Sequence, residues 1–239
     1  GAISGIAYAF CGLLLCSLKW PNNIASFGLM PWVVCTCLRV ANLRSLGFAS
    51  LVGATQMLSG APEVILLTWV IVGAMTMGEA IAQRNARPIF FLGAVVLLVT
   101  MISAAQLWPF WDLLKLSQRS EKFAGSDWPM PIWGWANFLL PLYGTFPSYH
   151  NVPAQPDQYW TSTYYVPLAA LAFVPWSWKM GWRPRVALGL AIFGAWMALG
   201  EAGILYSTLR KVAPGLGFMR FPIKFVILPV FLLPWLAAY

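Results

Sequence analysis

The sequence is poor in charged residues and in histidine. Only 9% of its 239 residues are Asp, Glu, Lys or Arg, seven residues are acidic and a single one is His. Soluble domains carry about 25% charged residues and about 45–50% apolar residues. In this chain 60% of the residues are hydrophobic. Because lipid acts as the solvent for apolar surface that water would reject, the composition predicts an integral membrane protein.

The sequence also lacks the motifs of common catalytic and cofactor sites. It contains no nucleotide-binding glycine loop, no Ser/His/Asp arrangement and no metal-ligand spacing. Cys11, Cys16, Cys35 and Cys37 lie in apolar stretches, which favours buried free thiols in helices over a disulfide framework. With His150 as the single histidine, a His/Cys zinc site has little support. We therefore predict no cofactor; a divalent metal is possible but is not indicated by these residues.

The two ends of the sequence are apolar. The chain has no initiator methionine, opens within the apolar run 1–10 and closes within the apolar run 225–239. We therefore expect the sequence to be an internal piece of a longer polypeptide.

What the sequence does contain is a series of apolar segments of membrane-spanning length. A helix that crosses a bilayer needs about 20 mostly apolar residues. We predict an all-α, polytopic transmembrane bundle of about eight helices that forms a single domain over residues 1–239. The predicted spans are 1–18, 24–40, 46–60, 64–82, 88–107, 163–178, 186–200 and 222–239.

Basic residues in the short connections predict the orientation. Lys and Arg are enriched in cytoplasmic loops, so three basic turns are placed on that side. The longest connection, 108–162, is then an extracytoplasmic loop. The net charge of +8 is mainly an orientation signal, because the basic residues are scattered rather than gathered into a nucleic-acid-binding patch. The basic turns contain Arg39 with Arg44, Arg84 with Arg87, and Lys179 with Arg183 and Arg185.

Loop 108–162 is rich in Trp, Pro and Tyr. Such rings are typical of the aromatic belt at the level of the lipid headgroups. The same composition also suits a loop that folds onto the membrane surface and walls a cavity. Both interpretations stay open at this point.

Two acidic residues stand out because they lie close to membrane depth. Glu63 opens a predicted helix and Glu201 follows one. Acids at such positions are costly and usually face a cavity or a partner, so Glu201 is a candidate catalytic carboxylate. Three further outer acids are expected to be solvated beside bases of the same loop. These acids are Asp112, Glu121 and Asp127, and the bases are Lys115, Arg119 and Lys122.

The last predicted helix begins with two cations. Arg220 and Lys224 flank Phe221 and Pro222 on the predicted outer side, where basic residues are not expected. Cations at a helix start oppose the helix dipole, and a bound anion would resolve that conflict. We therefore predict a lipid-phosphate site at Arg220 and Lys224, with Arg119 and Arg210 as second choices. The alternative is that these side chains reach the headgroups without specificity.

An ordered set of short motifs resembles the bacterial YfhO-type multi-pass membrane proteins of the GT-C glycosyltransferase superfamily. The resemblance covers the chain from about residue 30 to its end, and its most specific part is the closing Arg-Phe-Pro-Ile-Lys. The matching motifs are Ser59-Gly-Ala-Pro-Glu63, Gln106-Leu-Trp-Pro109, Arg119, Phe138-Leu-Leu-Pro141, Tyr164-Tyr165, Leu199-Gly200, Tyr206, Pro214-Gly215 and Arg220-Phe-Pro-Ile-Lys224.

The resemblance implies an enzyme of the bacterial inner membrane. Such an enzyme would move a sugar from a polyprenyl-phosphate donor to an extracytoplasmic acceptor, with inversion at the sugar carbon. A carboxylate would act as the general base, and the family places it in a first outer loop that would precede Gly1. Arg220 and Lys224 would stabilise the departing lipid phosphate.

Two other functions remain compatible with the sequence. Glu63, Glu201 and proline-interrupted helices are also features of a lipid or solute transporter. Few charges and many small residues suit a non-catalytic membrane subunit that packs against protein partners. In every case membrane lipids are expected partners, and nucleic acid is not.

Overall fold

The computed structural model describes residues 1–116, 127–148, 152–212 and 219–238. Within these residues the chain is mostly helical, and its strands form one short hairpin. The predicted all-α fold class is therefore confirmed. The chain divides into two compact units: unit 1 comprises Gly1–Lys19 and Arg119–Tyr239, and unit 2 comprises Trp20–Gln118.

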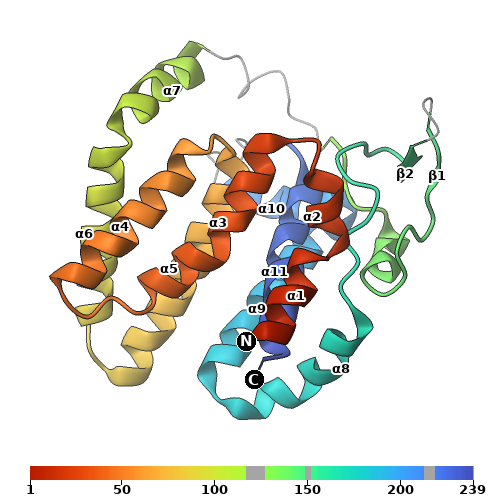
Figure 1. Cartoon of the computed structure of the whole chain (residues 1–239). Helices are drawn as coiled ribbons and strands as arrows, with labels where there is room; N and C mark the ends of the chain where they lie inside the picture. The colour runs from red at the N-terminus through yellow and green to blue at the C-terminus, as the bar shows by residue number, and fades with distance from the viewer. Residues whose placement is uncertain (117–126, 149–151, 213–218, 239) are drawn as a thin grey trace. The chain divides into compact units, whose positions relative to one another are not determined.

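Unit 2 is a bundle of antiparallel helices. Helix α3 packs on α4 and α5, and α6 packs on the same two helices (Figure 1). The turns α3–α4 and α5–α6 therefore lie at one end of this unit, and they hold the first two basic pairs named above. The helices of unit 2 are α3 (Pro21–Cys37), α4 (Leu43–Leu58), α5 (Pro62–Gln83), α6 (Arg87–Ile102) and α7 (Ala104–Leu116).

Local sequence signals fix where these helices begin. Asn42 caps α4 in a reciprocal arrangement: its side-chain oxygen accepts from the Ser45 amide at 2.9 Å, and the Ser45 hydroxyl accepts from the Asn42 amide at 3.0 Å. Pro62 stands in the first turn of α5, where no amide hydrogen is needed. Gly60, with φ of +77°, makes the tight turn before it.

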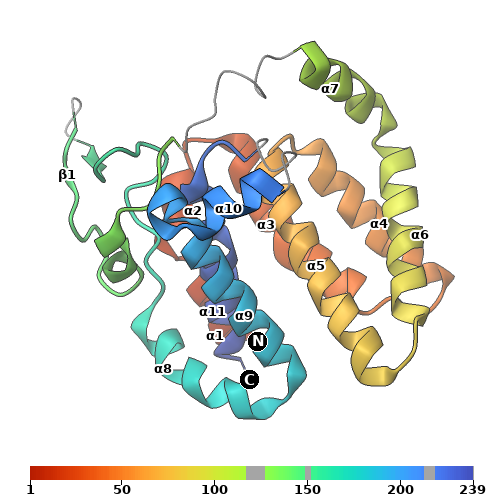
Figure 2. The same ribbon diagram turned by 180° about the vertical axis from the view of Figure 1, so that it is seen from behind.

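The α6–α7 pair is sharply bent. The two helices meet at Ser103 with an angle of 82° between them (Figures 1 and 2). Helix α7 therefore covers the beginning of the predicted loop 108–162, which is helical up to Leu116. The predicted span 88–107 runs across this break.

Unit 1 is built around the apolar helix α11. This helix is almost entirely buried and packs against α1, α8 and α9 (Figure 2). The approach to α9 is close because Gly194 has no side chain: a β-carbon there would lie 2.7 Å from Leu228 Cβ and 2.8 Å from the Phe225 carbonyl oxygen. The helices of unit 1 are α1 (Ala2–Ala9), α2 (Gly12–Ser17), α8 (Leu168–Ser177), α9 (Trp182–Met197), α10 (Leu205–Val212) and α11 (Ile227–Leu236).

Shorter elements connect the helices of unit 1. Strands β1 (Phe146–Pro147) and β2 (Pro153–Ala154) pair antiparallel, with Phe146 opposite Ala154. The 3-10 helices are η2 (Ile132–Phe138), η3 (Trp178–Met180), η4 (Gly200–Gly203) and η6 (Pro222–Val226), the last leading directly into α11.

The helices match the predicted spans in position but mostly not in length. In the part of the chain that the structure describes, α5 is long and apolar enough to cross a membrane, and the bent α6–α7 pair gives a second such segment if it is counted as one. The 22 residues of α5 extend roughly 33 Å at 1.5 Å per residue, whereas the 17 residues of α3 extend roughly 26 Å. The number of eight spans stays a prediction.

Candidate functional site

Charged and aromatic side chains from three segments of unit 1 meet at the start of η6. We call this group the Phe221 cluster. Trp128 and its neighbour come from the segment before η2, two rings come from the segment before α8, and the rest belong to the segment that opens η6. The cluster consists of Asp127, Trp128, Tyr159, Trp160, Arg220, Phe221 and Lys224.

An ion pair joins two of these segments. The Arg220 guanidinium donates a hydrogen bond from Nε to Oδ2 of Asp127 at 2.7 Å. Its Nη2 forms an ion-pair contact with the same oxygen at 2.5 Å. The side chains of Arg220 and Asp127 remain 36% and 44% exposed. Since both partners are charged, these contacts are short, but partial exposure keeps the pair accessible to solvent and to competing ions.

The Phe221 ring is the common neighbour of both cations. Its centroid lies 5.2 Å from Arg220 Cζ and also 5.2 Å from Lys224 Nζ. The Trp128 ring stacks on it with centroids 4.5 Å apart and planes inclined by 23°. The electron-rich faces of aromatic rings attract cations, so the Phe221 ring holds two positive charges close to it.

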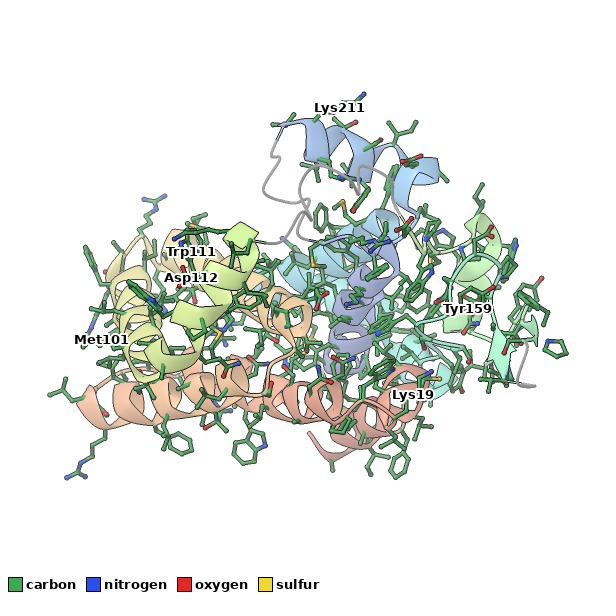
Figure 3. The ribbon with its side chains drawn as sticks, turned by 90° about the horizontal axis from the view of Figure 1, so that it is seen from above. Lys19, Met101, Trp111, Asp112, Tyr159 and Lys211 are labelled. Atoms are coloured by element: carbon green, nitrogen blue, oxygen red, sulfur yellow. The ribbon has the colours of Figure 1, made fainter. Side chains whose placement is uncertain are left out.

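Two further rings complete the cluster. The Lys224 ammonium lies 5.9 Å from the centroid of the buried Trp160 ring. Tyr159 (labelled in Figure 3) meets Trp128 edge to face at 6.3 Å, and it is exposed. The cluster therefore has a buried side at Trp160 and an open side at Tyr159.

Main-chain hydrogen bonds hold the Asp127 segment against the helices. The Ile223 amide donates to the Trp128 carbonyl at 3.2 Å, and the Met130 amide donates to the Ala198 carbonyl at 2.7 Å. Trp128 has φ of +56°, a conformation that is rare for a bulky residue. Its ring stack and its accepted hydrogen bond maintain that conformation, which places Asp127 next to Arg220.

A buried polar network orders the segment that carries Tyr159 and Trp160. The Asn137 side chain is buried, and its oxygen accepts from the Thr163 hydroxyl at 2.7 Å and from the Tyr164 amide at 3.2 Å. Tyr164 donates to the Gly134 carbonyl at 3.0 Å and accepts from Gln155 Nε2 at 3.2 Å. Much of loop 108–162 is therefore a folded segment of unit 1.

Tyr206 links the remaining candidate residues to the cluster. Its hydroxyl donates to the Met219 carbonyl at 2.6 Å, and Arg210 Cζ lies 5.6 Å from its ring. Burial raises the pKa of Tyr206, the charge and hydrogen bond of Arg210 oppose that rise, and the charges of Glu201 and Asp127 add to it. Glu201 and Arg210 thus lie within electrostatic reach of the same phenol as Asp127.

The structure brings together most of the residues that the sequence singled out. Arg220 and Lys224 share the Phe221 ring, while Arg210 and Glu201 lie near Tyr206, with Glu201 exposed on η4. Lys211 is exposed on α10 (Figure 3). Arg119, Glu121 and His150 lie outside the described residues.

Asp127 is the residue whose role the sequence did not indicate. We expected it to be solvated beside bases of its own loop, but it pairs with Arg220, 93 residues further along the chain. Asp112 does follow that expectation, since Lys115 Nζ lies 3.5 Å from its oxygen (Asp112 in Figure 3). No local pattern around Asp127 distinguishes the two acids, because its partner is distant in sequence.

Ligands for a metal are not gathered in the described ranges. No group of three or more His, Cys, Asp or Glu side chains in those ranges could hold a metal ion. The four cysteines are free, but the predicted burial holds fully for Cys11 and not for Cys35, which is exposed. Glu63 lies in the first turn of α5, in unit 2.

Comparison with known proteins found no matching family model, no matching curated protein and no matching solved structure. The function is therefore inferred from the side chains of the Phe221 cluster.

Proposed function

We propose that the Phe221 cluster binds the phosphate of a polyprenyl-phosphate-linked sugar, and that the protein is a GT-C-type glycosyltransferase of the bacterial inner membrane, similar to the YfhO-type proteins. The observation that carries this proposal is the shared position of Arg220 and Lys224 at one aromatic ring. A planar guanidinium and a compact ammonium at one ring are two kinds of cation that proteins use to bind phosphate.

The aromatic surroundings support a ligand that lies at a membrane surface. Trp128 and Tyr159 are rings of the kind that concentrate at the headgroup level. A lipid phosphate at the same level would meet Arg220 and Lys224 with part of its water already removed. Loss of water strengthens each charge interaction, so such a site would favour a specific phosphate over a diffuse contact.

Exposed apolar side chains support a multi-pass location. Soluble monomers rarely expose large contiguous apolar patches, whereas lipid requires an apolar surface. Large hydrophobic side chains are exposed along both α5 and α6, and Met101 is one of them (Figure 3). The exposed residues on these two helices include Leu66, Val70, Met77, Ile81, Ile89, Phe90, Val96, Leu97, Met101 and Ile102.

The proposed reaction is an inverting transfer. The acceptor hydroxyl oxygen forms a bond to the anomeric carbon of the sugar, and the bond from that carbon to the lipid-phosphate oxygen breaks. The hydroxyl proton passes to a carboxylate base, and the bonding electrons leave with the phosphate. Arg220 and Lys224 stabilise that charge as it develops. Glu201 is the candidate base within this chain.

Binding of polyprenyl monophosphate to the purified protein tests the phosphate site. Arg220→Ala and Lys224→Ala should each weaken binding about tenfold or more, because each removes a charge-assisted contact. Arg185→Ala is the matched control: Arg185 also lies over an indole, Trp178, at 5.8 Å, but outside the cluster. Unchanged affinity in both cluster variants would reject the proposal.

A lipid or solute transporter is the second candidate, and the buried polar contacts of unit 2 favour it. Gln56 Nε2 donates to Thr68 Oγ1 at 2.9 Å and to the Ser26 carbonyl at 3.2 Å, and all three residues are buried. Polar side chains inside a membrane bundle often line a substrate path. This function would be favoured if the protein takes up a lipid or solute into vesicles, if Gln56→Leu abolishes that uptake, and if the protein transfers no sugar.

A further inference from the structure

We infer that Asp127 is the resident counter-ion of the phosphate site: it occupies Arg220 while the site is empty and releases it when a ligand phosphate arrives. This inference rests on the proposed function, because it specifies which group pairs with Arg220 at the same phosphate site before and after the ligand binds. The ligand class is a phosphomonoester or phosphodiester on a lipid.

The geometry makes the carboxylate and a phosphate direct competitors. Arg220 directs Nε and Nη2 at a single carboxylate oxygen, at 2.7 and 2.5 Å. A phosphate oxygen would use the same two N–H groups, because it is an anionic acceptor of similar size and charge. The two anions therefore cannot hold that edge of the guanidinium at the same time.

The exchange favours the phosphate because of Lys224. Its ammonium lies at the same distance from the Phe221 centroid as the Arg220 guanidinium. A phosphate carries several acceptor oxygens and can engage both cations, whereas Asp127 Oδ2 engages Arg220. Half-exposed ion pairs contribute little on their own, so the pair between Asp127 and Arg220 is one that a stronger anion can replace.

The carboxylate can leave without moving the main chain. The Trp128 carbonyl accepts from Ile223, and the Trp128 ring stacks on Phe221, so the residue next to Asp127 is fixed at two points. Rotation of the short Asp127 side chain is then enough to turn its oxygens away from Arg220. The aromatic platform stays in place while its two anions exchange.

Replacing Asp127 by Asn tests the inference, because the amide keeps the shape but removes the competing charge. We expect Asp127→Asn to bind polyprenyl monophosphate in phosphatidylcholine nanodiscs about three- to tenfold more tightly than the natural protein. This gain should shrink as salt is raised, since screening weakens the competing pair. Phosphatidate in the same nanodiscs shows whether the gain belongs to lipid phosphates generally or to the polyprenyl chain.

Two variants serve as controls. Asp112→Asn removes a carboxylate whose partner is Lys115, at 3.5 Å in unit 2, and it should leave the affinity unchanged. Asp127→Glu keeps a competing charge and should bind less tightly than Asp127→Asn. The Glu variant also shows whether position 127 tolerates a substitution. A failure of Asp127→Asn to fold is then distinguished from a change in affinity.

The results separate the inference from the proposed function. Binding by the natural protein with equal or weaker binding by Asp127→Asn would overturn the counter-ion role, and weaker binding would identify Asp127 as a positioning residue for Arg220. Absence of binding in the natural protein and in both Asp127 variants would instead overturn the proposed phosphate site itself.

Discussion

The Tyr206 hydroxyl donates a 2.6 Å hydrogen bond to the main-chain carbonyl of Met219. This bond ties α10 to the segment that carries Arg220, and both residues are buried. It is therefore a point at which the stability of unit 1 and the geometry of the Phe221 cluster depend on one side chain.

Tyr206→Phe should destabilise the protein by about 1–3 kcal/mol, because the Met219 carbonyl would remain buried without its donor. For a chain of this size, each kcal/mol corresponds to a decrease of about 2–4 °C in Tm. Thermal unfolding in detergent measures the change. Tyr143→Phe is the control, since Tyr143 is exposed. Equal Tm values for the two variants would contradict the role given to Tyr206.

The same tyrosine predicts a dependence of stability on high pH. Because burial raises the pKa of Tyr206 above its unfolded value of about 10, the folded protein holds this proton more tightly than the unfolded chain. The resulting stabilisation is fully present below pH 10 and is lost as pH rises through the folded pKa. Tm should therefore fall less between pH 8 and pH 11 in Tyr206→Phe than in the natural protein. An identical fall in both proteins would contradict the titration assigned to Tyr206.

Gln56 and Ser26 should respond oppositely to substitution. Gln56→Leu removes the donors to Thr68 and to the Ser26 carbonyl and should cost about 1–2 kcal/mol. Ser26→Ala keeps that carbonyl and removes a buried hydroxyl that has no hydrogen-bond partner in the described part of the chain, so stability should be unchanged or increased. Thermal unfolding of both variants checks the pair, and a larger loss for Ser26→Ala would be inconsistent with these contacts.

Replacement of two glycines of α9 by alanine should have opposite effects on stability. A β-carbon at Gly194 would meet Leu228 at 2.7 Å, whereas one at Gly189 meets nothing within 4 Å. Gly194→Ala should therefore cost about 1–3 kcal/mol through overpacking against α11. Gly189→Ala should stabilise the helix by up to about 1 kcal/mol, because Ala is the better helix former. Chemical denaturation of both variants measures the two changes in the free energy of unfolding, which must have opposite signs.

The positions of the helices could be predicted because apolar segments and prolines mark them locally. Asn42 with Ser45, and Gly60 before Pro62, are signals of this kind. The break at Ser103 could not be predicted, since the apolar pattern of 88–107 continues across it and no proline or glycine stands there.

The cations of the candidate site could be predicted for a similar reason. Arg220 and Lys224 lie four positions apart and contradict the expected charge of their side of the membrane, and their common ring, Phe221, lies between them in sequence. Asp127 could not be assigned, because its contact with Arg220 exists only after 93 residues of chain have folded. Sequence thus revealed the charges that share one segment but not their counter-charge.

The 82° bend between α6 and α7 has a consequence for how the chain would meet a bilayer. If α6 stands along the membrane normal, α7 must run nearly parallel to the membrane plane. Trp108 and Trp111 are exposed on α7, and indoles partition to the boundary between headgroups and acyl chains. Helix α7 would then lie at the membrane interface and fix the depth of unit 2 in the bilayer. Quenching of its tryptophan fluorescence by lipids brominated at different depths would measure that depth.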